Sequence, residues 1–264
     1  MIKEPQQPTR AARRDALAAD PDAAMPRFRV VKAAITAALV AGEWKSGATI
    51  PEQGALAARF AVSIGTLRKA IDELVAEKIL IRRQGLGTFV AAHGPVRNRF
   101  HFFHIVDGDG GRELPQPQLL GFARRRADAQ QAAQLRIDKG ARIFSISNLL
   151  RLAGEPVVYD TIVVAADMFP GLSGQRVRSR DSTIYSLYQT RYGINVVRAS
   201  ELLRAGAADR ATAALLGLRA GAPVLEIFRI AYTYNDVPVE LRLSRVNTSS
   251  RFYEAERGKG ETNR

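Results

Sequence analysis

Two stretches decide the fold of the N-terminal part: residues 62–70 read VSIGTLRKA and residues 82–90 read RRQGLGTFV. In the first stretch, Ser63 precedes apolar residues at helical spacing, so we expect it to cap a helix that buries Leu67 and Ala70. In the second, apolar segments flank a Gly-rich turn that carries arginines, a pattern typical of a β-hairpin. The sequence therefore predicts a helix followed directly by a hairpin.

Two further helices are expected upstream of this pair. Apolar residues recur at helical spacing over 27–41, and Gly42 is a plausible stop. Gly47 and Pro51 then mark a loop before a short helix over 52–60. Three helices followed by a hairpin form a winged helix-turn-helix, in which the third helix enters the major groove of DNA and the hairpin, or wing, lies along the backbone or the adjacent minor groove.

This order of elements resembles the N-terminal domain of the GntR family of bacterial transcription regulators. The resemblance covers residues 27–90 and rests on the two stretches quoted above, which stand in the family's order. It implies a DNA-binding domain at residues 27–91. It also implies that the start of the third helix and the wing contact DNA through Ser63, Gly65, Thr66, Arg68, Lys69, Arg83, Gln84, Gly85 and Gly87.

Side-chain chemistry supports this set of contacts. Ser63 and Thr66 place hydroxyls and unpaired backbone N–H groups at a helix N-terminus, where the helix dipole attracts phosphate oxygens. The planar guanidinium of Arg68 can pair with guanine edges or with a phosphate. Gly85 and Gly87 let the backbone of the wing approach the duplex. The alternatives are capping alone for Ser63, a solvated arginine at Arg68, and an ordinary tight turn in the hairpin.

The chain departs from the family pattern at two positions. Family members carry a DNA-contacting arginine at the entry to the second helix, whereas residues 51–56 read PEQGAL here, and the position after Ser63 is Ile64 instead of arginine. Ile64 can offer only an apolar contact, for example to a thymine methyl group. We therefore expect fewer guanine contacts and more dependence on Arg68, the wing and a flexible basic arm at residues 1–26.

Charge and composition narrow the class of protein. The 264 residues include 39 Lys and Arg against 26 Asp and Glu, and the net charge of +13 favours a polyanionic partner such as nucleic acid, although any Arg-rich chain shows the same excess. The absence of cysteine excludes disulfides and fits a reducing cytosol. Neither an export signal nor a run of about 18 apolar residues stands out, so we expect a cytoplasmic protein.

The second part of the chain mixes strands and helices after an expected linker at residues 92–99. The pattern predicts strands over 100–106, 142–152, 157–164, 195–205, 224–234 and 237–246, and helices over 128–135, 182–192 and 209–216. The fold class is therefore α+β, with an antiparallel sheet in a domain over residues 100–254 and a disordered tail at 255–264.

This region resembles the UTRA effector-binding domain of HutC-type GntR regulators, whose fold is similar to that of chorismate lyase. The motifs that carry the resemblance include GEPV at 154–157, TIY at 183–185, YGI at 192–194 and DVPVE at 236–240. It implies a metabolite-responsive repressor that binds an inverted-repeat operator as a homodimer. It also implies an effector site that includes Asp160, Thr183, Tyr185 and Glu240, although Tyr185 as a core residue and the two acids as ordinary strand residues are the alternatives.

One departure from the UTRA pattern limits the effector. Members that sense phosphosugars carry an Arg-x-Arg pair in the strand before the GEPV turn, which clamps the phosphate. Asn148 and Leu150 occupy those positions here, and strand alternation turns the neighbouring Arg151 to the opposite face from Leu150. We therefore expect an effector other than a sugar phosphate.

No catalytic residue, cofactor or metal site is expected. Ser63 and Gly65 lack the first glycine and the strand of a nucleophile elbow, and His101 and His104 point to opposite faces of a strand with no third ligand. Two alternatives to a ligand-controlled regulator remain: a lyase-like enzyme, suggested by the fold alone, and an architectural DNA-binding protein without an effector. Stabilisation by a metabolite would distinguish a sensor from both.

Overall fold

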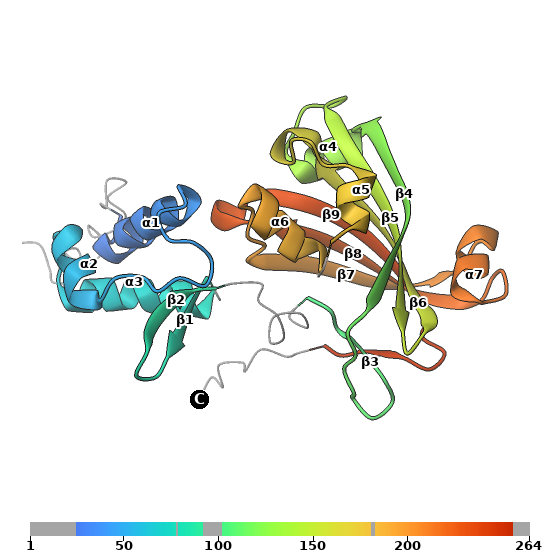
Figure 1. Ribbon diagram of the computed structural model, residues 1–264, viewed down its shortest axis with the longest axis horizontal. Helices are drawn as coiled ribbons and strands as arrows, with labels where there is room; N and C mark the ends of the chain where they lie inside the picture. Colours follow the sequence, from blue (N-terminus) through green and yellow to red (C-terminus); the bar gives the residue numbers. More distant parts are fainter. Residues whose placement is uncertain (1–24, 78, 92–101, 181–182, 256–264) are drawn as a thin grey trace, which may run out of the picture.

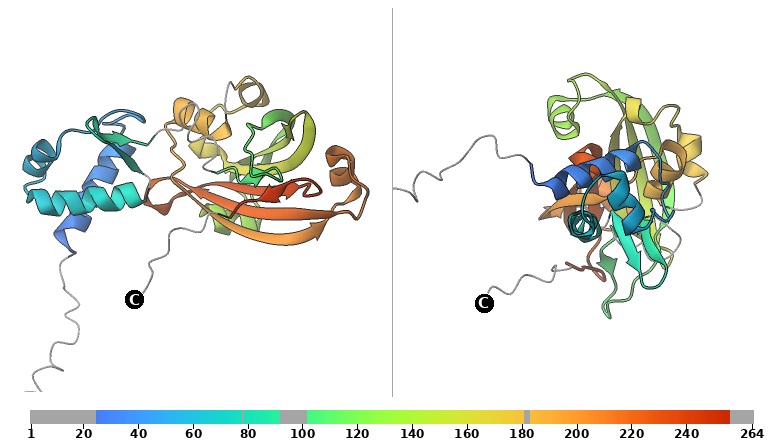
Figure 2. Two further views of the ribbon diagram at one scale, coloured as in Figure 1. Left: turned by 90° about the horizontal axis from the view of Figure 1, so that it is seen from below. Right: turned by 90° about the vertical axis from the view of Figure 1, so that its left-hand side faces the viewer.

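The structure is a computed structural model that describes residues 25–77, 79–91, 102–180 and 183–255 (Figure 1). The predicted arm at 1–26, linker at 92–99 and tail at 255–264 lie outside these ranges, except for residues 25, 26 and 255. A helical domain that carries a small hairpin and a domain built on a large sheet lie end to end, with α2 at one end of the molecule and α7 at the other (Figure 2). The predicted α+β class is confirmed.

The N-terminal domain is the expected winged helix-turn-helix. Its elements are α1 (Arg27–Val40), α2 (Gln53–Arg59), α3 (Ile64–Ala76), β1 (Leu80–Arg83) and β2 (Gly87–Val90). The two strands pair in antiparallel fashion as the wing.

A single apolar core holds the three helices and the wing together. Ile35 of α1, Leu56 of α2 and Ile71 of α3 are completely buried in it. Val30 fits the helical spacing of α1 but is 53% exposed, because the buried stripe of that helix passes through the neighbouring Val31.

The C-terminal domain contains a six-stranded antiparallel sheet in the order β4-β5-β6-β9-β8-β7. Its strands are β4 (Gln116–Arg126), β5 (Arg142–Leu152), β6 (Glu155–Ala165), β7 (Arg198–Ala207), β8 (Pro223–Tyr232) and β9 (Pro238–Val246). A separate two-stranded ribbon joins β3 (Ile105–Val106) to β10 (Phe252–Tyr253).

Helices cover both faces of the large sheet. They are α4 (Ala129–Leu135), α5 (Gly174–Arg178), α6 (Ile184–Tyr192) and α7 (Arg210–Leu216). Ile162 and Val163 are neighbours on β6 and therefore point to opposite faces. Ile162 packs in one cluster with residues of α5 and α6, and Val163 packs in another with residues of α4. Among helices formed by described residues, none is long and apolar enough to cross a membrane.

Two expectations about secondary structure are wrong. The strand expected over 100–106 is reduced to β3, and residues 102–104 form a turn and loop. Strand β4 was not expected. It lies at an edge of the sheet, where most of its side chains are partly or fully exposed, and a bulge between Leu119 and Gly121 breaks its alternation. An edge strand with an irregular pattern lacks the period-two signal by which strands are recognised.

Substitution of Ile162 by alanine tests the core beneath α6. Ile162 is completely buried, so Ile162→Ala is expected to lower the free energy of unfolding of the C-terminal domain by about 2–5 kcal/mol. Leu202→Ala is the matched control on the same sheet, because Leu202 is 73% exposed and its loss should change stability by less than about 0.5 kcal/mol. Denaturant unfolding of both variants measures the difference; similar losses would contradict the packing described.

Candidate nucleic-acid interface and ligand site

The first turn of α3 presents polar groups on an exposed surface. Ser63 is the N-cap of the helix: its Oγ accepts a hydrogen bond from the Thr66 backbone N–H at 3.2 Å and lies 3.0 Å from Thr66 Oγ1. Gly65 and Arg68 are exposed beside them, while the opposite side of α3 is buried in the domain core. The helix is therefore fixed by its apolar face and leaves the predicted DNA-contacting residues accessible.

Lys69 also projects from α3 and is exposed. Its Nζ lies 4.2 Å from the centre of the Phe28 ring of α1. This cation–π contact orients the side chain while the ammonium group remains available to an anion.

The wing exposes the other predicted residues at its turn. Arg83, Gln84, Gly85 and Gly87 are all exposed, and the two glycines have φ of +72° and +106°. Such positive φ values strain other residue types, so glycine allows this tight turn. The guanidinium of Arg83 lies 4.7 Å from the centre of the Phe89 ring.

Arg82 was not among the predicted contact residues. Its guanidinium forms an ion pair with Asp72 of α3 at 2.6 Å. The wing is thereby held against α3 by a contact near the predicted DNA-contacting residues, although a half-exposed pair of this kind stabilises the domain only weakly.

In the C-terminal domain, Glu240 of β9 is a buried carboxylate beneath α6. Tyr185 and Tyr188 of α6 donate hydrogen bonds to its two oxygens, at 3.0 and 2.8 Å. Asp160 of β6 is also buried and accepts a hydrogen bond from Ser244 Oγ at 2.5 Å. Three of the four predicted effector residues therefore belong to one buried polar cluster.

Arg242 connects the two acids and was missed from the sequence. Its Nε donates to Glu240 Oε1 at 2.9 Å, and its Nη1 donates to Asp160 Oδ2 at 3.3 Å. Because side chains alternate along a strand, Glu240, Arg242 and Ser244 of β9 all face α6. Counting every second residue along the predicted strand from Glu240 would thus have identified Arg242 and Ser244 from the sequence.

Burial controls the ionisation of this cluster. It raises the pKa of Tyr185 to about 12, with a further contribution from the neighbouring Glu240 carboxylate, and it raises the pKa of Tyr188 well above its usual value with the same help. Burial opposes the charge of Arg242, but Glu240, Tyr185 and Asp160 raise the pKa of Arg242 well above its usual value. At neutral pH the tyrosines are therefore neutral donors and the arginine is charged.

The fourth predicted effector residue, Thr183, lies at the start of α6. Its Oγ1 accepts a hydrogen bond from the Ser186 backbone N–H at 3.2 Å, so it caps the helix that carries the two tyrosines. Within the described ranges, no three His, Asp or Glu side chains gather as metal ligands would.

The two positions where the phosphosugar-sensing pattern has arginine, Asn148 and Leu150, lie on β5. Asn148 is opposite Asp160 of β6 in the strand register and is only 2% exposed. Leu150 is buried as well. A β-bulge in the pairing of β5 with β6 separates Leu150 from Arg151. The Nη1 of Arg151 donates a hydrogen bond to the Gly154 carbonyl at 3.0 Å.

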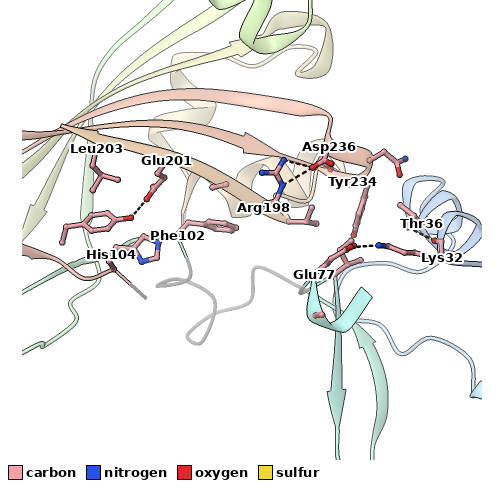
Figure 3. A pocket seen from close by; sticks show the side chains of 18 residues that line it. Lys32, Thr36, Glu77, Phe102, His104, Arg198, Glu201, Leu203, Tyr234 and Asp236 are labelled. Atoms are coloured by element: carbon pink, nitrogen blue, oxygen red, sulfur yellow. Dashed lines mark hydrogen bonds and ion pairs between the residues drawn. The ribbon is translucent and has the colours of Figure 1, made fainter. Parts of the chain in front are cut away.

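A cleft of about 830 Å³ lies between the two domains (Figure 3). Lys32 and Glu77 line it from the winged helix-turn-helix domain and form an ion pair at 2.5 Å, and Lys32 also pairs with Glu73 at 3.0 Å. Arg198 and Asp236 line it from the sheet domain and pair at 2.7 Å. The charged side chains named on both walls are thus engaged in ion pairs.

The domains are bridged by a polar contact at Asn195. Its Nδ2 donates to Tyr234 Oη at 2.8 Å and to Ser46 Oγ of the DNA-binding domain at 2.7 Å. Gln189 of α6 donates to Asn195 Oδ1. Tyr234 lies in the 3-10 turn η3 (Tyr234–Asp236) between β8 and β9, and its ring belongs to the apolar core of the DNA-binding domain.

Comparison with known proteins assigns both halves of the chain. Residues 28–90 match the family described as bacterial regulatory proteins, gntR family, and residues 111–250 match the UTRA domain. The "Probable fructoselysine utilization operon transcriptional repressor" of Escherichia coli K12 is 30% identical over 206 residues, which cover 76% of this chain and 82% of that protein. The transcriptional repressor PhnF of Mycolicibacterium smegmatis is 27% identical over 75% of this chain and 80% of its own.

Solved structures give the same assignment. The ligand-binding domain assigned to the GntR family from Bordetella bronchiseptica is 31% identical, with a TM-score of 0.58 over 61% of this chain and 99% of that domain. The crystal structure of PhnF from Mycobacterium smegmatis is 25% identical, with a TM-score of 0.52 over 87% of this chain and all of that one.

Removal of the Glu240 charge tests how much the charge balance of the buried cluster contributes to the stability of the protein. In Glu240→Gln the amide keeps the shape of the side chain, but it leaves Arg242 with a single acidic partner, so we expect a loss of about 3 kcal/mol in the free energy of unfolding. Glu155→Gln at the exposed start of β6 is the control and should leave stability unchanged. Equal stability of the two variants in denaturant unfolding would contradict this role of Glu240.

Proposed function

The chain belongs to the GntR family of bacterial regulatory proteins, in its UTRA-containing HutC branch, and we propose that it is a homodimeric repressor whose affinity for an inverted-repeat operator is set by a small-molecule effector. The family consists of transcription regulators, not enzymes. Repression is proposed because two similar proteins are named as repressors.

The observation that carries the DNA-binding proposal is the first turn of α3. Its exposed surface presents the capped N-terminus of a helix, the Ser63 and Thr66 hydroxyls and the Arg68 guanidinium. Backbone N–H groups and hydroxyls at such a terminus favour phosphate oxygens, and a guanidinium two residues after Thr66 favours guanine edges. Ile64 is 51% exposed in the same turn and supports an apolar contact where relatives carry an arginine.

An inverted repeat follows from the need to place two recognition helices. One copy of this domain offers one recognition helix, which covers one half-site. A twofold-symmetric pair presents two such helices to successive major grooves about 34 Å apart. The two half-sites of the operator are then related by the same symmetry as the two chains.

The effector is proposed to bind at the polar cluster of Asp160, Tyr185, Glu240 and Arg242. Tyr185 and Tyr188 attach α6 to this cluster, and Gln189 on the same helix reaches the Asn195 bridge to the DNA-binding domain. A ligand that moves α6 therefore changes the bridge, and with it the relative orientation of the two domains. An architectural DNA-binding protein has no need for such a connection.

Arg68→Ala tests the DNA contact. Loss of the guanidinium is expected to weaken operator binding by about 1–3 kcal/mol, which corresponds to roughly 5-fold to 150-fold in Kd. The measurement is a gel-shift titration with a fragment that the unmodified protein selects from a random DNA pool. Arg219→Ala, at an exposed position after α7, removes the same charge at the far end of the molecule and is expected to change the affinity little; an unchanged Kd for Arg68→Ala refutes the contact.

Asn195→Ala tests the bridge between the domains. It removes the donor to Ser46 and Tyr234, so the loop at residues 41–50 is expected to open more often and to exchange its backbone hydrogens about tenfold faster. Hydrogen–deuterium exchange with mass spectrometry measures this rate. Gln134→Ala on the exposed side of α4 is the control, and identical exchange in both variants would argue against Asn195 as the bridge.

A further inference from the structure

We infer that the buried cluster beneath α6 binds a small zwitterion, a ligand that carries both the carboxylate and the ammonium group of a free amino acid. The inference rests on the proposed function, because it names the chemical class of the effector. It depends on two buried atoms that lack hydrogen-bond partners, Asn148 Oδ1 and Arg180 Nε. Buried polar atoms are nearly always paired in folded proteins, so unpaired ones at a single site require a partner, and a polar ligand is the partner that we infer.

Asn148 provides the place for a donor. Its side chain is 2% exposed, and its position on β5 is opposite Asp160 on β6, so both side chains project from the same face of the sheet. The Asn148 carbonyl oxygen and the nearby Asp160 carboxylate are both acceptors. An ammonium group, which has three donors and a positive charge, matches this pair.

Arg180 provides the place for an anion. It follows α5, and its Nη1 donates to the Val177 carbonyl while its Nε is buried without a partner. Burial and the positive charge of Arg242 lower the pKa of Arg180, whereas Asp160 acts in the opposite direction. Two guanidinium groups thus repel one another beside Asp160, and a ligand carboxylate beside Arg180 relieves this repulsion and accepts the free N–H.

Arg242 offers a second donor on the same side. Its Nη2 lies 2.8 Å from Glu240 Oε1 but forms no hydrogen bond there. The carboxylate of a bound ligand has two oxygens, one for each guanidinium.

The charge balance of the cluster favours a zwitterion over a phosphate. Asp160 and Glu240 are matched by Arg180 and Arg242, so the cluster is neutral before a ligand enters. A zwitterion preserves this balance, whereas a phosphate monoester adds a charge of about −1.5 to −2 to a poorly solvated site. The absence of arginine at Asn148 and Leu150 agrees with this conclusion.

Calorimetric titration of the full chain with amino acids tests the inference. The probes are the twenty standard L-amino acids, β-alanine and γ-aminobutyrate. At least one is expected to bind with a micromolar Kd, and its methyl ester and its N-acetyl derivative, which each lose one charge, are expected to bind at least tenfold more weakly. If none of these probes binds, the inference is overturned.

Two variants connect binding to the two unpaired atoms. Arg180→Met and Asn148→Leu preserve approximate side-chain size and are each expected to weaken binding of the amino acid at least tenfold. In Arg180→Met the preference for the free amino acid over its methyl ester should fall, because one of the two guanidinium partners of the carboxylate is gone; an undiminished preference for the free acid overturns the assignment. Arg178→Met is the matched control, since Arg178 is the last residue of α5, lies two positions before Arg180 and is exposed.

Failure of this inference is distinguishable from failure of the proposed function. Glucosamine 6-phosphate and glucose serve as a charged and a neutral probe in the same titrations, followed by gel shift with the selected DNA fragment. If either binds, loses its binding in Glu240→Gln and alters DNA affinity, the effector site stands and the zwitterion is refuted. If an amino acid binds through Arg180 but leaves DNA affinity unchanged, the ligand class stands and the proposed control of DNA binding is refuted.

Discussion

The buried carboxylate of Glu240 is the constraint around which the C-terminal domain is arranged. Its charge is balanced by Arg242 of the same strand, and its two oxygens receive the hydroxyls of Tyr185 and Tyr188. Those two hydrogen bonds fix the register of α6 on the sheet. A network of buried charges stabilises a fold less than apolar packing of the same volume would, so its presence in the middle of the sheet points to binding more than to stability.

The strand that contains Glu240 also connects the buried cluster to the DNA-binding domain. β9 carries Glu240, Arg242 and Ser244 of the cluster, and the turn η3 joins β9 to β8; from this turn Tyr234 enters the apolar core of the winged helix-turn-helix. The recognition helix α3 contributes Leu67 and Ile71 to that core. One hairpin therefore contacts the proposed ligand site along β9 and the core of the DNA-binding domain at its tip, which gives a short mechanical path between the two.

Sequence predicted the elements whose signals are local. The Ser63 cap, the helical spacing of α3 and the glycines of the wing all act within a few residues, and the structure contains each of them. The candidate effector residues came from a resemblance, which supplied Asp160, Tyr185 and Glu240 but not Arg242. Asn195 could not be predicted, because its partners lie 149 residues before it and 39 residues after it, and such pairings depend on how two domains meet.

The energy of the bridge agrees with the requirements of a switch. Allosteric coupling in proteins amounts to about 1–3 kcal/mol, and a neutral hydrogen bond contributes about 0.5–1.5 kcal/mol net. The contacts of Asn195 with Gln189, Ser46 and Tyr234 thus sum to a free energy that one ligand can supply or remove. A large apolar interface would hold the domains in one orientation, and no contacts would leave them uncoupled; the single buried ring of Tyr234 and a few polar contacts in series with α6 permit control.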